Sequence, residues 1–453
     1  MDFEGNRLIL PLSPEKKRHL YDAAVTGKAE GAYKQTAQTP SRFYMDSAEL
    51  SLEDAVNAAV QTHPSIRAAV GLLVQQGYLV SAAKAGYLPQ IGVEMLTQRE
   101  SNEDLAITPT LHLSQMVYDF GKIKSEVRHA RAGLGKQTLL AMDQVDTIIQ
   151  QTANALINVH RYQEQLKHAE TQITNVKRVV KMAEQRAKSG LASESDPVQA
   201  KTRLEAANAN LLTVRTLLSQ SREQLALLIG FRHDGPIAPM DAELFARADI
   251  YNKPDFDNMT VVMMAHADYA LADAQLAAAR SAAYPSIGIV ASTGKTLTGD
   301  NPHTGKEKDE YNSVGLNISQ SIYQGGRVTA QRNAAASARE SAFQSLAVAT
   351  LRAKELIYVS RLELEGLLEK QKILARRTKN IKTTRSLYQD QYQLGTRSVL
   401  DLLNSEQEYY QAVSEELSAE HEFWNGLVYF MILKGDARSI FGVDSVVDGD
   451  ASS

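Results

Sequence analysis

The fold is decided by a helix-breaking stretch that occurs twice, QYQLGTRSVLDLLN at residues 391–404 and KSGLASESDP at residues 188–197. The two copies lie 205 positions apart, which places Gly190 on Gly395. Glycine readily adopts the left-handed conformation that ends a helix. Long helical patterns lie on both sides of each stretch, so each is predicted to be the tip of a hairpin of two antiparallel helices.

Both tips also carry a spacing typical of a helix N-terminus. Ser193 precedes Asp196 by three positions, and Ser398 precedes Asp401 by the same distance. In such a pair the hydroxyl accepts a backbone N–H, and the acid faces the positive end of the helix dipole. A second helix is therefore expected to begin directly after each glycine turn.

The composition excludes several classes of protein. The chain has 453 residues, a formal net charge of −4 and no cysteine. This charge gives no reason to expect a nucleic-acid partner, and the lack of cysteine excludes disulfides, thiolate metal sites and a lipid anchor on an N-terminal cysteine. The N-terminus shows no signal-peptide pattern, so either the protein is cytoplasmic or the numbering begins after a removed or replaced signal.

Two stretches have the alternation of amphipathic strands, and each forms a predicted strand pair, at residues 90–118 and 286–323. In the first, apolar residues such as Ile91 and Val93 alternate with Gly92 and Glu94. A period of two places one side-chain type on each face of a sheet. Each half of the chain is therefore expected to contribute one hairpin of strands with an apolar face.

Long helices are predicted at residues 122–188 and 327–393, followed by return helices at 197–229 and 399–433. A helix of 67 residues spans roughly 100 Å. Uncharged residues in the first helix recur at alternating steps of four and three, which is the period of a left-handed coiled coil. Arg385 interrupts the corresponding series in the second helix.

The repeat divides the chain into five regions. They are an N-terminal extension at 1–50, a first repeat at 51–230, an equatorial linker at 231–260, a second repeat at 261–435 and a C-terminal tail at 436–453. The predicted fold class is mainly α with a small β part, built from duplicated helical hairpins that form a coiled-coil tunnel, with four strands per chain.

The sequence carries no motif of an enzyme, cofactor site or metal site. Residues 299–307 resemble a phosphate-binding loop but have one residue too many, and Glu307 stands where a hydroxyl residue should follow the lysine. The ten histidines form no H-E-x-x-H pair, and no G-x-S-x-G occurs. No catalytic residue, cofactor or metal is therefore predicted.

Four strands cannot close a membrane barrel, because bacterial single-chain barrels begin at about eight strands. Two chains would supply eight strands and three would supply twelve. A trimer would also place six similar helical hairpins around one axis, and a hollow helical cylinder on a barrel is a conduit. The alternative is a soluble coiled-coil scaffold or adaptor, which would explain the heptads but leave the amphipathic strands without a role.

Across residues 51–435 the chain resembles the TolC family of Gram-negative outer-membrane channels. The resemblance rests on Ile-Tyr-Gln-Gly-Gly at 322–326, on the proline-to-strand junctions at Pro89 and Pro285, and on residues 392–401. It implies a homotrimer with a twelve-stranded barrel in outer-membrane lipid and a helical tunnel in the periplasm. It also implies a periplasmic adaptor (membrane fusion protein) and an inner-membrane ABC or other transporter as partners.

The resemblance places Asp196, Tyr392, Arg397 and Asp401 in the network that constricts the periplasmic mouth. Where family members place a second acid after Asp401, this chain has Asn404, so the resemblance does not extend to a double acidic ring. The alternative is that both acids only cap helices, that Arg397 forms a surface ion pair and that Tyr392 packs in the seam. The residues expected to contact an adaptor are Gly190, Leu191, Ser193, Gly395, Thr396 and Ser398.

The cargo is an exported protein or a small molecule. Unlipidated members of the family that this chain resembles serve type I protein secretion and some efflux systems, and a chain without cysteine fits that group. Type I protein secretion is therefore the first expectation, and drug or small-molecule efflux is the alternative within the same family.

Overall fold

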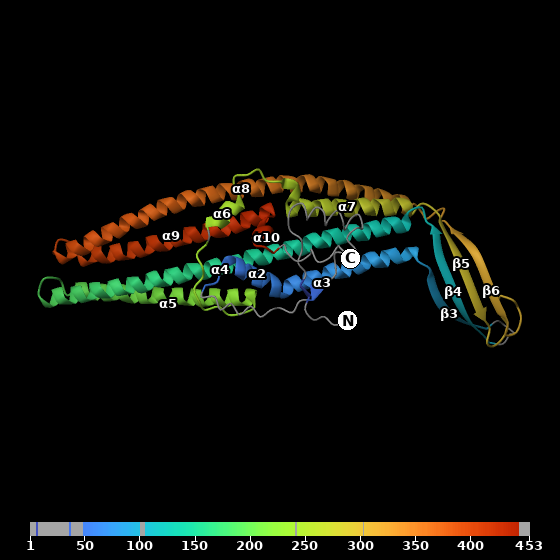
Figure 1. Cartoon of the computed structure of the whole chain (residues 1–453), viewed down its shortest axis with the longest axis horizontal. Coiled ribbons are helices and arrows are strands. Elements are labelled where there is room, and N and C mark those ends of the chain that lie inside the picture. The colour runs from blue at the N-terminus through green and yellow to red at the C-terminus, as the bar shows by residue number, and fades with distance from the viewer. Residues whose placement is uncertain are drawn as a thin grey trace.

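The computed structural model describes residues 49–99, 105–240, 242–301 and 303–443, and the backbone of a short strand pair formed by residues 6–7 and 36–37. The chain is elongated, with the tips of two helical hairpins at one end and a four-stranded sheet at the other (Figure 1). Most of the expected extension at 1–50, and the tail after residue 443, lie outside the described residues.

Helices make up most of the molecule, and two of them run for 67 residues each. A helix of this length spans roughly 100 Å. The α-helices are α2 (Leu52–Thr62), α3 (Pro64–Lys84), α4 (Lys122–Lys188), α5 (Ser195–Ile229), α6 (Ala242–Ala248), α7 (Thr260–Ser281), α8 (Arg327–Gln393), α9 (Val399–Lys434) and α10 (Ala437–Ile440).

The sequence pattern of residues 51–88 predicts a single helix that runs past His63, and the structure corrects this prediction because it contains two helices there. α2 ends at Thr62, and α3 begins at Pro64, because proline has no N–H with which to continue the preceding helix but fits the first position of a new one. His63 caps the new helix, since its Nδ1 accepts the N–H of Ser65 at 3.3 Å.

The sheet joins the two halves of the chain. β3 (Gln90–Gln98), β4 (Ala106–Tyr118), β5 (Ser286–Lys295) and β6 (Glu310–Ser319) lie side by side in that order, and every neighbouring pair is antiparallel. The second strand pair ends at Ser319 rather than at residue 323. Its partner β5 begins only at Ser286, directly after a proline that has no N–H to donate, so residues beyond Ser319 have no strand to pair with.

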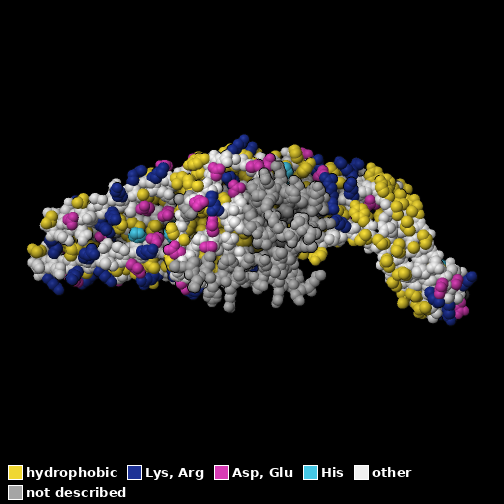
Figure 2. Space-filling view, in the orientation of Figure 1, with side chains coloured by type: hydrophobic (Ala, Val, Ile, Leu, Met, Phe, Trp, Pro, Cys, Tyr) yellow, Lys and Arg dark blue, Asp and Glu magenta, His cyan; other side chains and the backbone are white. Residues whose placement is uncertain are grey.

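One face of the sheet carries exposed apolar side chains, as the alternation predicts. Ile91 pairs with Leu113, and Ile287 pairs with Ile318, so apolar residues of neighbouring strands share a face. Ile91 and Ile318 are more than half exposed. Figure 2 shows hydrophobic side chains gathered over the strands.

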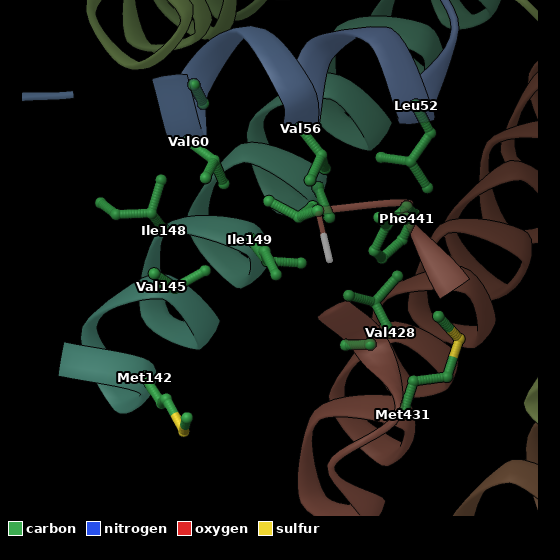
Figure 3. Close-up of a cluster of buried hydrophobic side chains, with 14 of the residues drawn as sticks. Leu52, Val56, Val60, Met142, Val145, Ile148, Ile149, Val428, Met431 and Phe441 are labelled. Carbon is green, nitrogen blue, oxygen red and sulfur yellow. The ribbon is translucent and has the colours of Figure 1, made fainter. Parts of the chain in front are cut away.

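The main core lies at mid-length, where segments distant in sequence meet. Side chains of α2, α4, α9 and the residues after α10 converge there (Figure 3). The contributors shown include Val56, Ile149, Val428 and Phe441, all nearly inaccessible to solvent. The packing fixes the two long hairpins to each other and leaves their tips to be joined by local contacts.

Among the described residues, no helix combines the length and the hydropathy that crossing a bilayer requires.

Candidate gate at the hairpin tips

The two tips share one turn geometry. Gly190 has φ +70° and Gly395 has φ +80°. The N–H of Leu191 donates to the carbonyl of Arg186 at 2.9 Å, and the N–H of Thr396 donates to the carbonyl of Gln391 at 3.0 Å. Each of these 6→1 hydrogen bonds spans a left-handed glycine, which is the Schellman motif that ends a helix.

At the second tip, α9 begins with the N-cap that the sequence predicts. Ser398 Oγ accepts the N–H of Asp401 at 3.1 Å and donates to Asp401 Oδ2 at 2.9 Å.

The first tip differs, and the predicted cap there is wrong. α5 begins at Ser195 rather than at Pro197, and Ser193 Oγ accepts the N–H of Ser195 at 3.2 Å. The N–H of Asp196 instead donates to the carbonyl of Ser193 at 3.1 Å. Glu194 already has right-handed helical backbone angles, so the helical conformation starts one residue before α5. As a result, the Ser193 hydroxyl does not reach the Asp196 amide.

Arg397 is held within its own hairpin. Its Nη1 lies 3.8 Å from Asp401 Oδ2, its Nε donates to Gln391 Oε1 at 3.0 Å, and its guanidinium lies 4.4 Å from the centre of the Tyr388 ring. Arg397 and Asp401 each keep about two fifths of their side-chain surface exposed. The pair is therefore accessible to a neighbouring molecule, and in isolation it contributes only about 0–1 kcal/mol.

Tyr392 lies in a small apolar cluster that joins the two hairpins. It is 2% exposed and packs with Val180, Ala200, Val399 and Leu402, among others. Its hydroxyl is buried and has no hydrogen-bond partner in the part of the chain that the structure describes. Burial raises the pKa of Tyr392, although the charge of Arg186 lowers it.

Asp196 is half-buried in the first turn of α5, and its charge acts on Tyr392 in the direction that raises the tyrosine pKa. The structure therefore brings Tyr392 and Asp196 to the same junction. It places Arg397 and Asp401 together on the second tip.

Sequence reasoning missed Arg186, which reaches from the last turn of α4 to the second hairpin. Its Nη1 donates to the carbonyl of Tyr392 at 2.9 Å, and its guanidinium lies 5.2 Å from the centre of the Tyr392 ring. The signal that could have found it is the repeat itself, because the position 205 residues later holds the uncharged Gln391.

A second contact between the hairpins involves Asn404, the position where the resemblance predicts an acid. Arg203 Nη2 donates to Asn404 Oδ1 at 3.3 Å, which joins α5 to α9.

The residues expected to contact an adaptor form the accessible end of the molecule. Leu191 is 69% exposed, and the neighbouring Leu394 on the other tip is 79% exposed. The remaining positions expected there, Gly190, Ser193, Gly395, Thr396 and Ser398, are also exposed. The two tips lie together at the end of the molecule opposite the strands (Figure 1).

Within residues 49–99, 105–240, 242–301 and 303–443, no group of three His, Asp or Glu side chains is placed to hold a metal ion. The contacts observed at the tips are charge-assisted hydrogen bonds and the burial of apolar side chains.

The sequence matches the profile of the family described as outer membrane efflux protein, over residues 55–231 and 257–424. These ranges cover all four strands of the sheet, α4, α5, α8 and α9 as far as residue 424. The chain belongs to this family. It is also 24% identical over 369 residues to the outer membrane protein TolC of Escherichia coli K12, a match that covers 76% of this chain and 74% of TolC.

Solved structures of channels share the fold. The CusC structure gives a TM-score of 0.74 at 16% identity, covering 86% of this chain and 91% of CusC. The outer membrane protein VceC from Vibrio cholerae gives 0.73 at 17% identity, covering 85% of this chain and 96% of VceC. This chain therefore has the architecture of TolC-family members, in which long helical hairpins carry a small sheet.

Proposed function

We propose that this channel protein is the passive exit duct of an export machine in the Gram-negative outer membrane. Its strands lie in the membrane, and its helices form a tunnel in the periplasm. An adaptor docks at the exposed tips and brings an inner-membrane transporter, whose cargo passes through the tunnel. The chain itself performs no chemical step.

The observation that carries this proposal is an open amphipathic sheet at the end of two long hairpins. β3 and β6 are the edges of the four-stranded sheet, and both carry exposed apolar residues. Unpaired edges favour association with further strands. Three copies would close the sheet into a barrel of twelve strands, within the size range of bacterial outer-membrane barrels.

We place the closed gate of this duct at Asp196, Tyr392, Arg397 and Asp401. The half-exposed Arg397 carries donors that can bind a carboxylate or carbonyl of a neighbouring protomer, and the guanidinium fork suits such bidentate contacts. Contacts of this kind are strong enough to close a mouth and exchange readily when an adaptor offers competing groups.

Type I protein secretion is the proposed task, and small-molecule efflux is the second candidate. The resemblance of residues 51–435 to the TolC family, whose members include type I secretion ducts, supports the first. The description of the family as efflux proteins supports the second. Co-purification of the partner transporter from cells distinguishes the two.

The purified protein in planar bilayers tests both the channel and the gate. A detergent-solubilised trimer should form small ion-conducting pores, and Arg397→Ala should raise the single-channel conductance several-fold because the mouth loses its charged contacts. The matched control is Arg376→Ala, an exposed arginine within α8 and away from the tip. A water-soluble monomer without conductance would contradict the channel proposal. Equal conductance of Arg397→Ala and the parent would contradict the proposed gate.

A further inference from the structure

Arg186 makes an unusual contact, because its side chain donates to the backbone of a different hairpin. Its Nη1 lies 2.9 Å from the carbonyl oxygen of Tyr392 and 3.4 Å from that of Gln393. Both carbonyls belong to the last turn of α8. The Tyr392 carbonyl also accepts the N–H of Gly395 at 3.1 Å. The last carbonyls of a helix carry the negative end of the dipole, so a guanidinium is favoured there.

Gly395 provides the space for this contact. A Cβ at Gly395 would lie 3.1 Å from Arg186 Nη2, closer than most van der Waals contacts. The positive φ of Gly395 already explains why the turn needs glycine. The guanidinium adds a second requirement, because a side chain at this position would push Arg186 away from the end of α8.

Turn chemistry alone does not require an arginine at this position. The equivalent residue in the second half, Gln391, makes the same backbone bond with its carbonyl, and its side chain accepts from Arg397 instead. The two halves therefore use one position for different purposes. Gln391 positions the proposed gate residue, whereas Arg186 connects the hairpins.

We propose that Arg186 is the tether that holds the second hairpin tip, α8–α9, against the first, α4–α5, within one protomer. The proposed gate residues on the second tip keep their closed positions only while this contact is made. The adaptor must therefore displace Arg186 from the end of α8 to open the duct. Arg186 acts through Tyr392 and Gln393 and is a positioning residue. This inference rests on the proposed function, since it assigns a tether to the same gate.

The tether and the apolar cluster around Tyr392 contribute differently. The cluster packs side chains of α4, α5, α8 and α9, and it resists separation of the helices without setting the direction of the last turn of α8. The guanidinium bonds to that turn directly. Removing Arg186 should therefore leave the helices packed while the tip itself gains freedom.

Because the chain has no cysteine, two spin labels can be placed without background. Leu191→Cys and Leu394→Cys put one label on each exposed tip, and trimers diluted with unlabelled protomers report the distance within a protomer. A second pair further up the hairpins, Leu212→Cys and Ile373→Cys, reports whether the helices separate as a whole; both positions are more than half exposed.

Each pair is measured in the parent, in Arg186→Ala, in Arg186→Lys and in the control Lys181→Ala, an exposed lysine of the same helix. We expect Arg186→Ala to broaden the tip distances and raise conductance several-fold, while the upper distances stay as in the parent. Lysine keeps the charge but loses the fork, so Arg186→Lys should give intermediate tip distances and conductance. Lys181→Ala should match the parent.

The outcomes separate the tether from the gate. Unchanged tip distances in Arg186→Ala overturn the tether, and equal broadening of both label pairs overturns it too, because that result assigns Arg186 to general packing. Broadened tips with parental conductance support the tether but place the gate elsewhere, which contradicts the proposed gate and leaves the tether standing.

Discussion

Arg438 Nη1 lies 2.9 Å from Asp146 Oδ2, and this ion pair joins α10 to α4 at mid-length of the molecule. The side chains are 0% and 5% exposed. Arg438 Nε and Nη2 have no hydrogen-bond partner among the described residues. Burial raises the pKa of the nearby Asp143, and the charge of Arg438 lowers it. Arg438 thus acts on two acids of α4, the buried Asp146 and the exposed Asp143.

Replacing Arg438 by methionine should destabilise the protein, because Asp146 would keep a buried charge without its arginine. Breaking one partner of a buried pair costs about 3–5 kcal/mol. The expected result is a clear fall in the urea midpoint of the purified protein, measured by circular dichroism. The double variant Arg438→Met with Asp146→Leu should recover most of the loss.

The matched control is the exposed pair Arg247–Glu53, whose nitrogen and oxygen are 2.6 Å apart. Arg247→Met should cost about 1 kcal/mol or less, since exposed pairs contribute little. Equal losses for Arg438→Met and Arg247→Met would contradict the importance of burial.

Tyr392→Phe should leave the free energy of unfolding close to that of the parent. The Tyr392 hydroxyl is buried without a partner, so removing it eliminates an unsatisfied polar group. Tyr392→Ala, in contrast, should cost about 3–5 kcal/mol through the cavity it leaves. Denaturant midpoints measure both effects. A clear fall in the midpoint of Tyr392→Phe would contradict this prediction.

Ser398→Ala should destabilise its tip more than Ser193→Ala does. Ser398 caps α9 by accepting the Asp401 amide, and losing a cap costs about 1 kcal/mol. Ser193 accepts the N–H of Ser195 in a local turn, and no side chain caps α5. Hydrogen exchange at the first turns of the two helices compares them; equal acceleration by both variants would refute the difference.

His421 should make the stability depend on pH. Burial lowers the pKa of its imidazole from 6.5 to about 4, and the charge of Arg161 acts in the same direction. Between these values the unfolded chain binds a proton that the folded chain does not, so stability present above pH 6.5 is lost as pH falls toward 4.

The His421→Gln variant should therefore lose less melting temperature than the parent between pH 7 and pH 5. His266→Gln, at an exposed histidine of α7, is the control and should follow the parent. The same pH dependence in parent and His421→Gln would exclude His421 as its source.

The repeat in the sequence was enough to predict the architecture, because helix ends and strand faces are set by local chemistry. Gly395 and Ser398 fix one tip through backbone conformation and a cap, and the alternation around Ile91 fixes a strand face. Two predictions from local sequence were wrong. Pro64 starts a second helix directly after His63, and the helical conformation after Ser193 begins earlier than the predicted cap requires.

The sequence by itself determined two hairpins, two strand pairs and the candidate gate residues on the second tip. Only the tertiary structure decided what those residues contact. The polar interruption at Arg385 is explained by Glu406, which lies 3.5 Å away and is nearly fully buried. The role of Arg186 depends on α8 ending beside α4, a relation between positions 206 residues apart. Spacing within one segment reports its own conformation, whereas the partner of a charged side chain is fixed by how the segments pack.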